Sequence, residues 1–136
     1  MNIIIIEVVI QAGREKVWNY WTLPEHITVW NHASDDWECP RAENNLTVGG
    51  VFSATMAAKD GSFSFDFAGT YTEIVPFEKI AYTFGDRKAV VTFIALSDTE
   101  TKVIEEFDPE TENPIAQQQA GWQAILNNFK QHVETN

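Results

Sequence analysis

Glu105 is the residue of this chain whose position most directly suggests chemistry. It alternates in step with Val103 and Phe107 along an extended run, so its carboxylate should point to the apolar side of a sheet. Burial without a cation raises the pKa of a carboxyl group and suits it to general acid or base catalysis. The alternative is a shifted strand register or a position at a water-filled mouth. Glu105 is the one candidate catalytic residue.

Bulky apolar side chains provide a second kind of site, a wall for an apolar ligand. The chain has five Trp, three Tyr and nine Phe, and many fall on the inward side of predicted strands and helices. The candidate ligand-binding residues are Phe52, Met56, Phe67, Tyr71, Tyr82, Phe93, Trp122, Ile125 and Phe129. The tyrosine hydroxyls would orient a ligand. Packing in a core that holds no ligand is the competing interpretation for each of these residues.

Metal and cofactor sites are not predicted. His26, His32 and His132 show no helical or hairpin spacing of metal ligands, and Asp35 and Asp36 indicate a solvated loop after His32. The sequence has no Gly-x-Ser-x-Gly elbow, phosphate-binding loop or dinucleotide fingerprint. We therefore expect neither a metal nor a cofactor.

Charge and hydropathy exclude two classes of partner. The net charge is −11, from 20 acidic and 9 basic residues, and would repel a phosphate backbone. The apolar residues 1–10 are interrupted by Glu7, follow no basic segment and are too few to cross a bilayer. We expect no nucleic acid partner, no membrane insertion and a cytoplasmic location.

The first third of the chain predicts one strand and two short helices within a single domain spanning residues 1–136. Residues 2–10 are rich in Ile and Val, which favours a covered strand. Bulky side chains at i, i+1 and i+4 from Val17 predict a helix that Pro24 must end. Pro24 suits the first position of a second helix with Ile27 and Trp30 on its buried side.

The remaining chain predicts an antiparallel meander followed by a long helix. Alternation indicates strands at residues 51–58, 63–75, 80–84, 88–96 and 101–107. Residues 37–43 form a weaker extended segment, which Pro40 should place at a sheet edge, and Gly69 should permit a sharp bend. Asn113 should cap a helix that begins at Pro114 and buries Ile115 and every third or fourth residue after it. The predicted fold class is α+β, with a curved sheet of about seven strands covered by the C-terminal helix.

Motifs spread over nearly the whole chain resemble one family. They are Val17-Trp18, Trp21-Thr22-Leu23-Pro24-Glu25-His26, Trp30, Val48-Gly49-Gly50-Val51-Phe52, Asp60-Gly61, residues 69–74 and residues 121–129. This pattern resembles homologues of the activator of the 90-kDa heat-shock chaperone ATPase, in the START-like (SRPBCC) superfamily of the birch pollen allergen. The resemblance implies a helix-grip fold, with a cavity between sheet and C-terminal helix that receives hydrophobic small molecules in relatives.

Three functions from different classes are compatible with this resemblance. The preferred one is binding of a small hydrophobic or amphipathic ligand, which requires a cavity of several hundred Å³ that side chains leave empty. The first alternative is an enzyme of the cyclase or hydrolase kind that uses Glu105 or a cavity tyrosine. The second is a chaperone-associated interaction domain, for which the resemblance is the only reason. The sequence leaves homodimer formation open.

Overall fold

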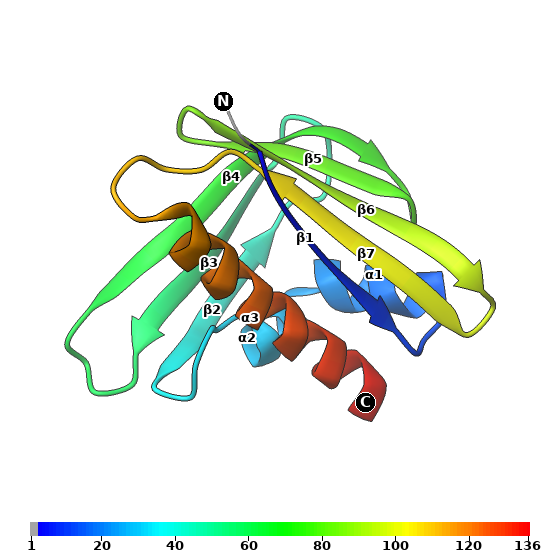
Figure 1. The fold of residues 1–136 in the computed structure, drawn as a ribbon, viewed down its shortest axis with the longest axis horizontal. Coiled ribbons are helices and arrows are strands. Elements are labelled where there is room, and N and C mark those ends of the chain that lie inside the picture. The colour runs from blue at the N-terminus through cyan, green and yellow to red at the C-terminus, as the bar shows by residue number, and fades with distance from the viewer. Residues whose placement is uncertain (1–2) are drawn as a thin grey trace.

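The computed structural model describes residues 3–136, which form seven strands and three helices (Figure 1). The strands are β1 (Ile4–Ile10), β2 (Trp37–Asn44), β3 (Val51–Ala58), β4 (Ser64–Val75), β5 (Lys79–Phe84), β6 (Arg87–Ser97) and β7 (Glu100–Phe107). The helices are α1 (Arg14–Thr22), α2 (Pro24–Trp30) and α3 (Ile115–Thr135). Asn2, predicted as the start of the first strand, lies outside the described residues. No helix in the described range is long and apolar enough to cross a membrane.

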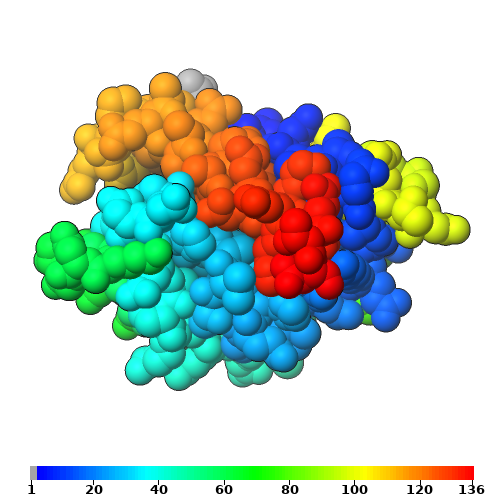
Figure 2. All heavy atoms as spheres, turned by 90° about the horizontal axis from the view of Figure 1, so that it is seen from below, coloured from blue at the N-terminus to red at the C-terminus, as the bar shows by residue number. Residues whose placement is uncertain are grey.

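All seven strands belong to one antiparallel sheet. Their order is β1-β7-β6-β5-β4-β3-β2, so the N-terminal strand lies beside the last one. The sheet curls around α3, which crosses its concave face (Figure 1). Viewed from below, α2 and α3 lie side by side over that face (Figure 2). The predicted α+β helix-grip fold is confirmed.

The two edge strands are protected in different ways. β2 is an edge strand, as Pro40 predicted, and its pairing with β3 is interrupted between Glu38 and Arg41. The edge of β1 is covered by α3, whose side chains donate hydrogen bonds to strand carbonyl oxygens. These bonds join Gln119 to Ile5 (3.3 Å), Gln123 to Glu7 (3.2 Å) and Lys130 to Val9 (2.6 Å). They fix the position of α3 along the sheet.

Gly69 allows two strands to pack closely. β4 continues through it, and Gly69 pairs with Phe52 of β3. A Cβ atom at this position would lie 2.7 Å from the Phe52 ring and 2.7 Å from the Thr83 carbonyl oxygen. The irregularity in β4 comes later, between Tyr71 and Glu73, where the register with β5 shifts. The close contact with the Phe52 ring explains the glycine at this position, and the bend stays a prediction.

The start of α3 differs from the prediction by one residue. Pro114 is the N-cap and Ile115 the first helical residue, and no side chain caps the helix. Ile115 is 46% exposed, so its predicted burial is wrong. The buried Gln118 instead anchors the preceding loop, since its amide accepts a hydrogen bond from the Glu110 backbone N–H (2.8 Å) and donates one to the Asn113 carbonyl oxygen (2.8 Å).

Candidate ligand-binding site

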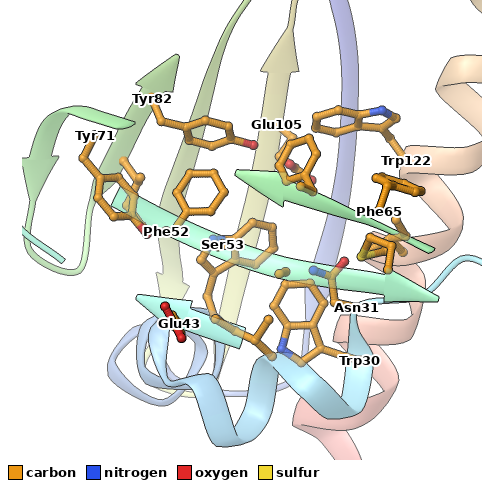
Figure 3. Close-up of a pocket in the computed structure, with 17 residues that line it drawn as sticks. Trp30, Asn31, Glu43, Phe52, Ser53, Phe65, Tyr71, Tyr82, Glu105 and Trp122 are labelled. Atoms are coloured by element: carbon orange, nitrogen blue, oxygen red, sulfur yellow. The ribbon is translucent and has the colours of Figure 1, made fainter. Parts of the chain in front are cut away.

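A cavity of about 240 Å³ lies between the concave face of the sheet and the helices (Figure 3). Strands β3, β4, β5 and β7 supply its floor, and side chains from all three helices close it from the other side. The volume is close to the lower end of small-molecule pockets, which measure roughly 300–1,000 Å³. The space suits a compact ligand.

Seven of the nine predicted ligand-binding residues line this cavity. They are Phe52, Met56, Phe67, Tyr71, Tyr82, Trp122 and Ile125. The rings are fixed by one another, because Trp122 stacks on Phe107 with 3.8 Å between ring centroids and Phe52 meets Tyr82 edge-on at 4.9 Å. These contacts hold the rings in place around the space.

Phe93 and Phe129 lie outside the cavity. They are 2% and 0% exposed and pack in the core. Phe93 contacts Trp18 edge-on (5.2 Å between ring centroids), and Phe129 contacts Trp21 in the same manner (4.9 Å). Both side chains point into the interior as predicted, Phe93 from β6 and Phe129 from α3. At this point, however, tryptophans of α1 pack against them. Their placement favours packing over a role in the cavity wall.

Several lining residues were not among the candidates. Trp21, Ile27 and Trp30 come from the two short helices, and their helical spacing had already marked them as buried. Phe65, which is 46% exposed, shares the alternation of Phe67. No sequence signal identified Asn31, at the C-terminal end of α2, or Glu43 on β2. Their positions in the cavity wall are set by the tertiary contact between α2 and the edge strand β2.

Glu105 points into the cavity, as predicted. It is 6% exposed, and its strand neighbours in register are Ile6 on β1 and Val91 on β6, both buried. Burial raises the pKa of its carboxyl group to about 8. The alternatives of a shifted register and a water-filled mouth are therefore wrong, and the catalytic role stays a prediction.

The two cavity tyrosines differ in what their hydroxyls do. The Tyr71 hydroxyl donates a hydrogen bond to Asn44 Oδ1 (2.6 Å), and Asn44 Nδ2 donates to the Thr22 carbonyl oxygen (2.7 Å). Burial raises the Tyr71 pKa to about 12. The pKa of Tyr82 is raised well above its usual range by burial and, secondly, by the Glu105 carboxyl group. The Tyr82 hydroxyl is directed toward Glu105 (Figure 3).

The structure joins two histidines that are far apart in the sequence. His26 Nδ1 lies 2.9 Å from His132 Nε2, which links α2 to the last turns of α3, and Tyr20 stacks on His26 at 3.8 Å. Burial, followed by the proximity of His26 and Lys16, lowers the pKa of His132. The described residues contain no group of three or more potential metal ligands. The pair is a direct contact between α2 and α3.

Comparison with known proteins identifies relatives of this chain. The family model described as "Activator of Hsp90 ATPase homolog 1-like protein" matches residues 11–134. A solution structure of an AHSA1-like protein from Aeromonas hydrophila is 42% identical, with 96% of this chain and 92% of that chain covered and a TM-score of 0.88. A protein from Cytophaga hutchinsonii is 51% identical, with 98% and 92% coverage and a TM-score of 0.83. No curated protein matches.

A more distant neighbour supports the fold alone. The structure described as the Aha1 dimer from Colwellia psychrerythraea has a TM-score of 0.75 over 98% of this chain and 97% of that chain, at 15% identity. Structural similarity at this low sequence identity shows that the curved sheet and the helix it encloses tolerate wide changes of sequence. Function must therefore be argued from the site.

Proposed function

This chain belongs to the family of Activator of Hsp90 ATPase homolog 1-like proteins, and from that premise we propose that it binds a small hydrophobic or amphipathic molecule in the cavity between sheet and α3. The observation that carries the proposal is the cavity of about 240 Å³ with aromatic walls. Aromatic and aliphatic walls with a few polar groups are the usual composition of small-molecule sites.

Packing on the concave face supports this proposal. Near α1, the aromatic rings of Phe93 and Phe129 are buried in the core and leave the cavity wall to other residues. Between these core rings and the rest of α2 and α3, space remains among the aromatic side chains. A ligand that entered would exchange water for aromatic contacts, which contributes roughly 25 cal/mol per Å² of apolar surface.

Filling the cavity tests the proposal. Ala54 is buried on the cavity floor, whereas Ala57 lies on the opposite face of β3 and is partly exposed. We expect Ala54→Phe to abolish binding of butylbenzene, followed by tryptophan fluorescence and by chemical shifts, and Ala57→Phe to leave it intact. An Ala54→Phe variant that binds butylbenzene as well as the wild type does would refute the proposal.

Glu105 supports an enzymatic alternative. A buried carboxyl group with a raised pKa that faces a cavity is a common property of general acids and bases. Candidate substrates of cyclases or hydrolases would then be turned over by the wild type and not by Glu105→Gln. Turnover retained in Glu105→Gln would remove this assignment.

Contact with a chaperone, homodimer formation and a cytoplasmic location stay predictions. The Colwellia protein is described as a dimer, and at 15% identity it supports the fold of this chain alone. Sedimentation of the purified protein over a range of concentrations tests for a dimer, with a monomer mass throughout as the contrary result. A pull-down with the host chaperone tests the other contact, and absence of binding would end it.

A further inference from the structure

The charged groups of the cavity have one sign. Among the residues that line it, Glu105 and Glu43 carry carboxyl groups, and none is Lys, Arg or His. An anionic ligand would meet no cation there, and it would be repelled by both side chains when they are ionised. The lining therefore disfavours fatty acids and other carboxylates.

The Glu105 carboxyl group lacks a partner within the protein. No hydrogen bond between described residues involves its oxygens, although the residue is only 6% exposed. No polar side-chain atom in the described range is both fully buried and unpartnered, so these oxygens are accessible from the cavity. A buried acid of this kind needs a hydrogen-bond donor, and the open side from which one can come is the cavity itself.

Given the proposed binding function, on which this step rests, we infer that the ligand is an apolar amine whose ammonium group pairs with the Glu105 carboxylate. An ammonium group supplies both the opposite charge and several donors, while a hydrocarbon supplies neither. Trp122 and the Tyr82 hydroxyl line the same cavity beside this carboxyl group (Figure 3).

Pairing with an amine is coupled to a proton. Burial raises the pKa of Glu105 to about 8, so the empty site holds a carboxylic acid at neutral pH. When an ammonium ion binds, the acid releases its proton to solvent and the ion pair forms. The other titratable groups that line the cavity are Tyr71 on β4, Tyr82 on β5 and Glu43 on β2, and the two tyrosines have pKa values raised away from neutrality. Amine affinity should therefore rise by up to about tenfold per pH unit below about pH 8 and then level off.

Three probes that share a phenylbutyl skeleton test the inference on the full chain: phenylbutylamine, butylbenzene and phenylbutanoate. At about pH 8 we expect the amine to bind at least about tenfold tighter than butylbenzene, and phenylbutanoate to bind weakest. Calorimetry in two buffers of different ionisation enthalpy should show release of about one proton per amine at pH 6. Glu105→Gln should abolish the amine preference, and Glu106→Gln, on the opposite face of β7, should preserve it.

The outcomes separate this inference from the proposed function. Butylbenzene that binds, together with an amine that binds no tighter, overturns the amine inference and leaves the binding function standing. The amine inference is likewise overturned if Glu105→Gln keeps the preference, or if the wild type binds the amine without pH dependence or proton release. Failure of all three probes overturns the binding function and the amine inference with it.

Discussion

The stability of Glu105→Gln relative to the wild type should increase with pH. The carboxyl group has a pKa of about 8 in the folded protein against 4.5 when exposed. Between these pH values the folded state keeps a proton that the unfolded state has released, so the stability of the wild type falls as pH rises. The slope is about 1.4 kcal/mol per pH unit, and the loss reaches on the order of 3–5 kcal/mol by pH 8.

Urea unfolding followed by tryptophan fluorescence at about pH 5, 6, 7 and 8 measures this difference. A buried glutamine amide carries its own desolvation cost of about 1–3 kcal/mol, which does not depend on pH, so the slope rather than the offset is the test. Glu106→Gln removes the same charge from the opposite face of β7 and should change stability by less than about 0.5 kcal/mol. Parallel pH profiles for wild type and Glu105→Gln would refute the raised pKa of the buried Glu105 carboxyl group.

Three further tests address packing and protonation elsewhere. Gly69→Ala places a Cβ 2.7 Å from a ring and a carbonyl oxygen and should cost about 1–3 kcal/mol in urea unfolding. Gly121→Ala on α3 meets nothing within 4 Å and should instead gain about 0.5–1 kcal/mol, so equal effects would contradict the role of close packing at Gly69. Tyr71→Phe removes the 2.6 Å hydrogen bond to Asn44 and should lower the free energy of unfolding by about 1–2 kcal/mol. Amide hydrogen exchange in β2 should become faster, and unchanged exchange would contradict a stabilising role of this hydrogen bond. Because the pKa of His132 is lowered in the folded protein, its contribution to stability is present above about pH 6.5 and is lost on acidification. His132→Gln should therefore reduce the fall in melting temperature between about pH 7 and 5. A melting temperature that falls as steeply as in the wild type would contradict this.

The sequence predicted those features that depend on local periodicity. Ile80, Tyr82 and Phe84 alternate with polar or small residues and form a strand buried on one side. Pro40 cannot donate to a ladder, and it lies in an edge strand. The inward direction of Glu105 followed from the same alternation. In each case a short-range rule determined the answer.

Features that depend on distant segments were not predictable in this way. Strand alternation identifies the face on which Phe93 lies, but not that α1 would cover it at that point. The contact between His26 and His132 joins residues 106 positions apart, and Gly69 is required by a ring on another strand. The positions of Glu43 and Asn31 at the cavity likewise depend on how the edge strand meets α2.

The cost of burying Glu105 connects the stability of the fold to its proposed ligand. An apolar side chain of similar volume between Ile6 and Val91 would avoid the desolvation of a carboxyl group. A carboxylic acid at this position is therefore unfavourable for folding alone, as groups at binding sites often are. An amine that supplies the missing partner offsets this cost, so it should raise the melting temperature of the wild type more than that of Glu105→Gln at equal concentration. Butylbenzene, which cannot pair with the carboxylate, should show no such difference between the two proteins.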